Sequence, residues 1–226
     1  MNERSFVSRQ SVSKGSKTAD SIRRHAERLF AARGYAAVSM RDIAEAVGLR
    51  VGGLYNHFPT KQDILRDLLV GHMDDLLAGW AAFDDPLGTP ADRLTGFARF
   101  HIRFHFEKPD AVFIAYMELR SLEPQNYAEV EALRRTYEGH LRAILAAGAP
   151  CFVVQDAAVA SRAIIAMLTG VTTWYRAGGR LGIDDIETIY VDMVRRSVGL
   201  AGLHDAAMAP SAAEAAHVGG RADIRA

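Results

Sequence analysis

Apolar residues recur at helical spacing along most of this 226-residue chain, and no segment shows the two-residue alternation of a half-buried strand. Successive patterns are separated by glycine, proline or short polar stretches. The chain is therefore expected to be all-α. About nine helices are predicted, over residues 18 or 20 to 34, 39–47, 50–58, 60–83, 94–104, 110–121, 127–145, 156–176 and 184–200.

The second and third predicted helices lie close together and are joined by a tight turn. Ser39 and Asp42 have the spacing of a capping box, which starts the second helix. Gly48 supplies the positive φ that ends it. Leu54 and Phe58, four residues apart, anchor the third helix on one face. This arrangement predicts a helix-turn-helix whose second helix enters a DNA major groove.

The opposite face of the third helix carries the candidate DNA contacts. Arg50 opens this helix without a side-chain cap, so either it reads a base or a phosphate, or water satisfies the helix start. The Gly52-Gly53 pair does not follow a strand and is interpreted as close backbone approach to DNA. The predicted contacts with bases or the groove are made by Arg41, Arg50, Val51, Gly52, Gly53 and Asn56. The predicted contacts with phosphates are made by Tyr55, His57 and Lys61.

The same stretch resembles a known family. The residues are LFAARGYAAVSMRDIAEAVGLRVGGLYNHFPTKQDIL, and the match extends over about residues 18–66. This region closely resembles the DNA-binding half of the TetR family of bacterial transcription regulators. The shared features are Phe30, Gly34, Ile43-Ala44, Gly48, Leu54-Tyr55, Phe58 and Lys61. Arg50 is a departure, because such proteins often have Ser or Thr at this position.

Charge is segregated along the chain although the net charge is zero. Residues 1–62 contain 11 Lys or Arg against 5 Asp or Glu, and the remainder contains 16 against 22. A net charge of +6 in the amino-terminal part and −6 in the rest suits a phosphate-seeking head on an acidic body. A chance distribution is the alternative.

Composition narrows the class of protein further. Apolar residues make up 49 % of the chain, and a single cysteine, Cys151, excludes an intrachain disulfide. No apolar run approaches the ~20 residues of a membrane helix, and the N-terminus is polar where a secretory signal is apolar. We therefore expect a soluble, cytoplasmic protein that does not contact a membrane.

Four regions are predicted from these patterns. Residues 1–17 form a basic arm, which either follows DNA or is a solvated terminus. Residues 18–62 form the helix-turn-helix domain, and residues 63–202 form a ligand-binding and dimerisation bundle. The last two helices have apolar seams suited to a homodimer that spans two half-sites of an operator. The Ala- and Gly-rich residues 203–226 are predicted to be a disordered tail.

The sequence gives little support for a metal site or a catalytic site. His101 and His105 are four residues apart, but no third metal ligand accompanies them, so a pocket or core role is preferred and no metal or cofactor is expected. Cys151 lacks a resolving cysteine for a redox switch. No catalytic spacing is present, and we expect a protein that is not an enzyme.

Aromatic and methionine side chains of the body are candidates for lining a cavity between helices, with plain core packing as the alternative for each. Residues 115–141 and 169–179 resemble a branch of the TetR family that controls fatty-acid or sterol-ring degradation and responds to acyl-CoA thioesters. The resemblance rests on Glu118-Leu119-Arg120, Leu122-Glu123-Pro124, Arg134-Arg135 and Trp174-Tyr175-Arg176.

This second resemblance implies an apolar tunnel for the acyl chain with arginines at its mouth for the CoA phosphates; ion pairs are the alternative role for each arginine. The predicted ligand contacts are Phe97, Arg99, His101, Arg103, Phe104, Phe113, Met117, Arg120, Tyr137, Met167, Trp174 and Arg176.

The hypothesis from sequence is thus a repressor that an acyl-CoA-like effector releases from its double-stranded DNA operator. The alternatives are a multidrug-sensing regulator of an efflux pump that presents Glu118 to lipophilic cations, an architectural DNA binder without a cavity, and an enzyme.

Overall fold

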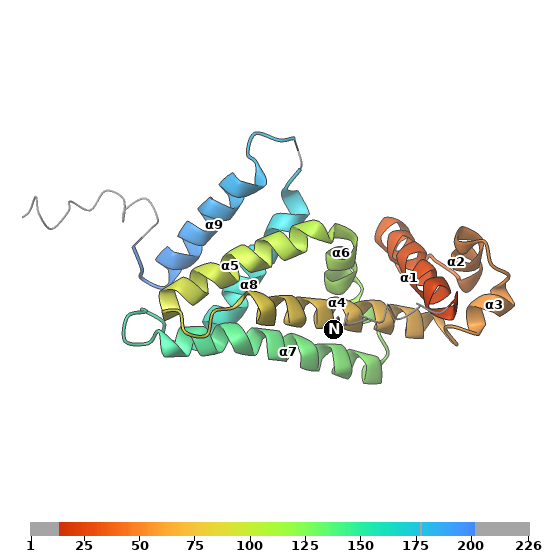
Figure 1. Ribbon diagram of the computed structural model, residues 1–226, viewed down its shortest axis with the longest axis horizontal. Coiled ribbons are helices and arrows are strands. Elements are labelled where there is room, and N and C mark those ends of the chain that lie inside the picture. Colours follow the sequence, from red (N-terminus) through yellow and green to blue (C-terminus); the bar gives the residue numbers. More distant parts are fainter. Residues whose placement is uncertain (1–13, 177, 202–226) are drawn as a thin grey trace, which may run out of the picture. The chain divides into compact units, whose positions relative to one another are not determined.

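Residues 14–176 and 178–201 are described in the computed structural model, and they form nine α-helices and one 3-10 helix without a strand (Figure 1). The all-α prediction is confirmed. The greater part of the predicted arm, residues 1–13, and the predicted tail, residues 203–226, lie outside the described residues. The helices are α1 Lys14–Arg33, α2 Met40–Val47, α3 Val51–Tyr55, α4 Lys61–Phe83, α5 Pro90–Glu107, α6 Pro109–Met117, η1 Leu119–Ser121, α7 Pro124–Ala147, α8 Ala157–Trp174 and α9 Ile183–Ser197.

Helix ends follow the local signals in most places. Asp156 caps α8 by accepting hydrogen bonds from the backbone N–H groups of Ala158 and Val159, at 2.8 and 3.0 Å. Thr60 and Asp63 form a capping pair at the start of α4, with the Thr60 amide 2.9 Å from the Asp63 carboxylate. These caps satisfy backbone donors that the first helical turn leaves without an intrahelical acceptor.

Several helix boundaries differ from the prediction, among them the starts of three helices. α1 begins at Lys14, at least four residues earlier than expected, and so includes the end of the predicted arm. Pro109 and Pro124 fall between the predicted helices 94–104, 110–121 and 127–145, but each is the first residue of a helix, α6 and α7. Proline is tolerated there because the missing N–H has no intrahelical partner at that position, and its fixed φ suits a helix.

The described chain divides into two compact units. Unit 1 comprises residues 14–81 and 105–137, and unit 2 comprises residues 82–104, 138–176 and 178–201. This division does not coincide with the predicted boundary after residue 62. The start of α4 belongs with the helix-turn-helix, because Arg23 of α1 donates hydrogen bonds to the Asp67 carboxylate of α4, the shorter at 2.5 Å.

The core of unit 1 is made by the predicted apolar positions of its first helices. α1 packs against both α2 and α6, and α2 packs against α3. Residues with almost no exposed surface come from α1, α2, α3 and α4: Ile22, Ala26, Phe30, Ile43, Ala44, Leu54, Ile64, Leu65 and Leu69. Burial of this many apolar side chains is the main term that stabilises the unit.

Unit 2 has its own core, with an internal polar pair. Its buried apolar residues include Leu94, Phe97, Leu141, Ile144, Leu168, Val171, Val191 and Val194. The imidazole Nε2 of His101 lies 2.9 Å from the Thr169 hydroxyl, which joins α5 to α8 inside the apolar surroundings. A hydrogen bond removes the cost of burying both groups.

α8 is the one helix among the described residues that is long and apolar enough to span a membrane, with a mean hydropathy of 1.3 over 18 residues. The expectation that no apolar run approaches this length therefore does not hold for α8. A single such helix is weak evidence for a membrane, because a core helix meets the same test. Ile164, Leu168 and Val171 of α8 are buried in this fold.

Candidate nucleic-acid interface

The helix-turn-helix is built from α2, α3 and the turn between them. Ser39 and Asp42 form the predicted capping box, with the Ser39 amide 2.7 Å from the Asp42 carboxylate and the Asp42 amide 3.2 Å from the Ser39 hydroxyl. Hydrogen bonding from Ser39 lowers the pKa of Asp42. Gly48, at φ 76°, ends α2 in the left-handed conformation that glycine adopts most readily. Leu49 and Arg50 then lead into α3.

α3 is shorter than predicted and depends on a single buried side chain. It comprises Val51–Tyr55 rather than residues 50–58, and Leu54 is its one buried residue. Arg50 is the N-cap residue in an extended conformation without a side-chain cap, as the sequence indicated. After the C-cap residue Asn56, the amides of His57 and Phe58 both donate to the Leu54 carbonyl, at 2.9 and 3.0 Å, and close the helix in a turn.

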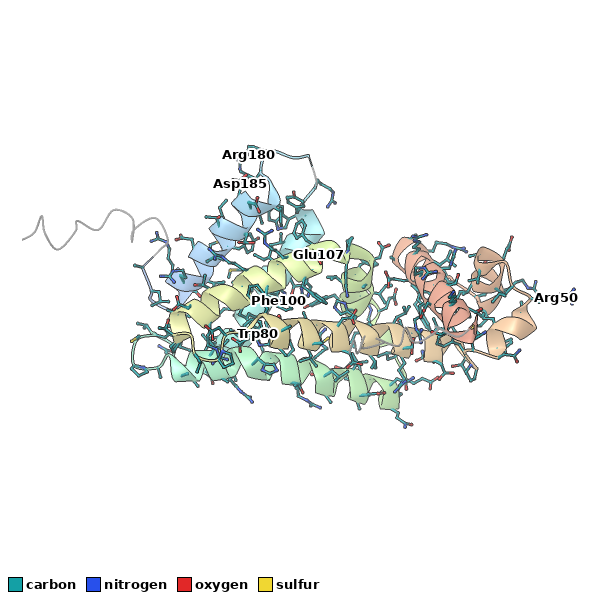
Figure 2. All side chains as sticks on the ribbon, viewed as in Figure 1. Arg50, Trp80, Phe100, Glu107, Arg180 and Asp185 are labelled. Carbon is teal, nitrogen blue, oxygen red and sulfur yellow. The ribbon has the colours of Figure 1, made fainter. Side chains whose placement is uncertain are left out.

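The predicted DNA-contacting residues belong to α2, to α3 and the residues beside it, and to the start of α4. Arg50 extends outward from the start of α3 (Figure 2). The exposed members of the set are Arg41, Arg50, Gly52, Tyr55 and Asn56, and the half-buried members are Val51, Gly53, His57 and Lys61. A Cβ atom added to Gly52 or Gly53 would meet no atom within 4 Å. Packing within the described chain therefore gives no reason for either glycine.

Lys61 has a different environment from the one predicted. Its Nζ donates to the backbone carbonyls of Tyr35 and Val38, both at 2.8 Å, and lies 4.1 Å from the centroid of the Tyr35 ring. Burial lowers the pKa of this ammonium. Two of its three N–H donors are thus used to hold the turn between α1 and α2, which gives Lys61 a structural role in the head.

The predicted ligand contacts are divided between the two units and differ in burial. In unit 1, Tyr137 is buried, and burial raises the pKa of its phenol well above the usual value. Phe113, Met117 and Arg120 are exposed. In unit 2, Phe97 and His101 are buried, Phe104 and Met167 are half-buried, and Trp174 and Arg176 are exposed. Trp174 stacks on Tyr190 with ring centroids 6.3 Å apart.

Two of the four arginines predicted at a cavity mouth are engaged in ion pairs. Arg99 lies 3.4 Å from the Glu187 carboxylate, and Arg103 contacts both Glu187 and Asp184, the latter at 2.7 Å. These hydrogen bonds raise the pKa of Arg103. In this structure, Arg99 and Arg103 therefore form ion pairs between α5 and α9, which is the alternative role considered for them.

Two hollows within single units are relevant to ligand binding. A cavity of about 190 Å³ in unit 2 is lined by Met167 and five other residues of α8 and the end of α9. Drug-sized ligands usually require ~300 Å³ or more. A groove of about 680 Å³ in unit 1 lies between α1, α4 and the start of α6, but charged side chains of both signs dominate it and none of the predicted ligand contacts lines it.

The residues that sequence reasoning missed are Tyr35, Gln62 and the head-facing role of Glu118. The Tyr35 amide donates to the Glu118 carboxylate at 3.0 Å, and the Tyr35 hydroxyl accepts from Gln62 at 2.9 Å. Glu118 also accepts a hydrogen bond from Ser121 at 2.7 Å. No local pattern marks a contact between residues 83 positions apart. The described residues contain no group of three or more His, Cys, Asp or Glu side chains placed to hold a metal ion.

Comparison with known proteins agrees with this geometry. Residues 22–68 match the family model described as bacterial regulatory proteins, tetR family, and residues 87–198 match the model of a tetracyclin repressor-like C-terminal domain. The HTH-type transcriptional repressor KstR2 of Mycobacterium tuberculosis is 28 % identical over 181 residues, which cover 74 % of this chain and 85 % of that protein.

Solved structures are similar over most of the described fold. A bacterial regulatory protein in the tetR family from Rhodococcus RHA1 has a TM-score of 0.78 and 30 % identity, with 82 % of this chain and 99 % of that chain covered. The structure of AibR in complex with isovaleryl coenzyme A and operator DNA has a TM-score of 0.74 and 24 % identity, with 78 % and 97 % covered, which shows a common fold alone.

Proposed function

Because this chain belongs to the TetR family of DNA-binding transcriptional repressors, we propose that it acts as a homodimer which an acyl-CoA thioester releases from its operator. The family is one of DNA-binding regulators rather than enzymes. The observation that carries the DNA-binding part of the proposal is the helix-turn-helix of α2 and α3, in which Arg41 and Arg50 are exposed and packing within the described chain does not explain Gly52 or Gly53.

Close approach to DNA is the reason we propose for Gly52 and Gly53. Each glycine destabilises a helix interior by roughly 1 kcal/mol relative to alanine. α3 has only five residues whose contacts could offset this destabilisation. A side chain at either position would stand between the helix backbone and a phosphate or base. Arg50, Tyr55 and Asn56 then supply the polar contacts on either side of the glycines.

Reversing the charge of Arg50 is expected to weaken DNA binding at least about tenfold at 0.1 M salt, because a favourable phosphate or base contact becomes a repulsive one. Fluorescence anisotropy with a labelled duplex, selected from a random pool by the wild-type protein, measures the effect. The slope of log affinity against log salt should also become shallower by about one.

Arg180→Glu is the matched control for Arg50→Glu, because it makes the same charge change at an exposed residue of the α8–α9 connection in unit 2 (Figure 2). If both variants lose the same affinity, overall charge rather than a local contact explains binding. If neither loses affinity, Arg50 is not at the interface.

Dimerisation through α8 and α9 is supported by apolar side chains that these helices leave exposed, among them Val159, Trp174, Ile189 and Met193. A second copy of the chain would cover them and place two α3 helices on half-sites about 34 Å apart. Light scattering that returns a single-chain mass of 24.7 kDa at micromolar concentration would refute this part of the proposal.

An acyl-CoA effector is supported by the resemblance of residues 115–141 and 169–179 to lipid-responsive members of the family, and by the fold shared with AibR, which was solved with isovaleryl coenzyme A. The Arg99 and Arg103 side chains are about half exposed, so phosphates of CoA would compete there with the Glu187 and Asp184 carboxylates. A multidrug sensor is less well supported, since Glu118, the acidic residue proposed for its cations, already holds the Tyr35 amide.

Release from DNA requires that the effector bind the DNA-incompetent state more tightly than the DNA-bound state. We expect isovaleryl-CoA or a longer acyl-CoA, titrated into the protein–duplex complex, to lower the anisotropy, and free CoA at the same concentration to have a smaller effect. Release by a cationic dye but by none of the thioesters would favour the multidrug alternative. No release by any compound would leave DNA binding intact and remove the effector class.

A further inference from the structure

The turn between α1 and α2 is held from outside the helix-turn-helix. Gly34 takes φ 78°, and the chain then turns at Tyr35 toward α2. The Tyr35 amide, which no helix uses, donates to the Glu118 Oε1 at 3.0 Å. Oε1 also lies 3.6 Å from the position that a Gly34 Cβ would occupy. A carboxylate that follows α6 thus reaches the backbone of the DNA-binding head, within unit 1.

Both oxygens of this carboxylate are engaged. Oε2 accepts a hydrogen bond from the Ser121 hydroxyl at 2.7 Å, while the Glu118 amide donates to the Ile114 carbonyl at 2.9 Å and ends α6. The backbone of Glu118 is therefore continuous with α6, and its side-chain rotamer is fixed by η1. A hydrogen bond to a charged acceptor is stronger than one between neutral groups. Movement of α6 would shift this acceptor.

The other polar groups of Tyr35 are held by the first two residues of α4. Its carbonyl accepts from Lys61 Nζ at 2.8 Å, and its hydroxyl accepts from Gln62 Nε2 at 2.9 Å. The same Gln62 amide donates to the Ser121 carbonyl at 2.7 Å, and its oxygen accepts from the Glu123 amide at 3.1 Å. Tyr35 is thus the point at which the α1–α2 turn, the start of α4 and η1 are joined.

The charge of Glu118 also affects Lys61, whose ammonium donates to the Tyr35 carbonyl. Burial lowers the pKa of Lys61, and the negative charge of Glu118 opposes that shift. Removing the carboxylate would therefore release the Tyr35 amide and also make the half-buried ammonium beneath the same turn less favourable. The two contacts are expected to weaken together.

We propose that Glu118 is a positioning residue that fixes the DNA-competent orientation of the helix-turn-helix by holding the Tyr35 amide, so that displacement of α6 lowers DNA affinity. This inference rests on the proposed function for its DNA readout. It assigns to one carboxylate a hydrogen-bonded connection between the helix that carries exposed Phe113 and Met117 and the turn that leads into α2, in addition to the packing of α1 on α6. The alternative is a contact that adds stability without affecting DNA binding.

Three variants separate these roles. Glu118→Ala removes both hydrogen bonds, Glu118→Gln keeps an acceptor for the Tyr35 amide but removes the charge, and Ser121→Ala removes only the group that fixes the rotamer. Glu129→Ala is the matched control, because Glu129 forms an ion pair with Arg66 at 2.5 Å between α7 and α4 in the same unit and does not contact the turn. It loses the same charge.

The first measurement is hydrogen exchange at the Tyr35 amide in the full-length protein without DNA. Loss of a hydrogen bond to a charged acceptor should raise the exchange rate about tenfold to a hundredfold in Glu118→Ala, with a smaller rise in Glu118→Gln and in Ser121→Ala. Exchange in Glu129→Ala should match the wild type at this amide. Unchanged exchange in every Glu118 and Ser121 variant would overturn the contact itself.

The second measurement is affinity for a duplex that the wild-type protein has selected from a random pool. Glu118→Ala is expected to bind at least about tenfold more weakly, because the head must be ordered at the moment of binding, and Glu129→Ala is expected to bind as the wild type does. If Glu118→Ala does not fold, Glu118→Gln and Ser121→Ala carry the comparison with a smaller loss.

Each remaining result is decisive. Faster exchange with unchanged affinity would show that Glu118 only stabilises the turn, and tighter binding would show that it holds a DNA-incompetent orientation; either overturns the proposal. If the wild-type protein selects no duplex, the proposed function itself fails. If the wild type binds DNA and Glu118→Ala binds equally well, only the role of Glu118 fails.

Discussion

Replacing Leu54 with alanine is expected to lower the free energy of unfolding by about 3 to 5 kcal/mol and to abolish measurable DNA binding. Leu54 is fully buried, and it is the one side chain that fixes α3 to the rest of unit 1. A five-residue helix cannot persist without tertiary contacts, because a first helical turn is costly to form. Arg50 adds no side-chain cap that could compensate.

Urea denaturation and anisotropy with the selected duplex measure the two effects of Leu54→Ala. Leu87→Ala is the control for stability, because Leu87 is 96 % exposed and its truncation leaves no cavity. Tyr55→Ala is the control for binding: Tyr55 neighbours Leu54 but is about half exposed, so the variant should fold normally and still bind DNA more weakly. Normal DNA binding by Leu54→Ala would mean that α3 is not the DNA-contacting helix.

The helix-turn-helix could be predicted because its signals are local. Ser39 and Asp42 form their capping box within one turn, and Gly48 ends α2 by its own backbone conformation. Such features depend on residues at most a few positions apart, which the sequence displays directly. The shortening of α3 was missed because Leu54 and Phe58 keep their helical spacing in a turn as well as in a helix.

Partners of charged side chains could not be predicted in the same way. Lys61 is the first residue of α4, and a cation at a helix start suggests a phosphate site. The acceptors of its ammonium are instead the carbonyls of Tyr35 and Val38, 26 and 23 positions earlier. Arg103 was assigned to CoA phosphates, and its partners on α9 lie more than 80 positions later. Charge marks such residues as polar, but only the folded chain decides which opposite charge or carbonyl lies within reach.

Apolar residues raise a related ambiguity, since spacing identifies a face but not what covers it. Phe97 and Phe113 were grouped as ligand contacts because both stand on apolar helical faces. In the structure, Phe97 has no exposed surface, whereas Phe113 is 44 % exposed. Phe97 stacks on His101 with ring centroids 6.1 Å apart, and His101 is itself bound to Thr169. Phe97 therefore has the environment of a core residue.

Phe97→Ala is accordingly expected to lower the free energy of unfolding by about 3 to 5 kcal/mol, because truncation of a fully buried ring leaves a cavity and loses its burial energy. Phe113→Ala should change it by less than about 1 kcal/mol, since that ring is already partly in water. Urea denaturation of the two variants beside the wild type gives both values. Both variants remove the same aromatic ring, so they differ only in its surroundings.

Titration of isovaleryl-CoA into the protein–duplex complex then separates core packing from ligand contact. A Phe97→Ala variant that folds at low temperature should keep the effector concentration for half-release within about threefold of the wild type, because a packed ring does not touch a ligand. If Phe97→Ala instead denatures with the wild type and requires at least about tenfold more effector, the ring faces a ligand cavity, and the core that joins Phe97 to His101 and Thr169 opens in the effector-bound state.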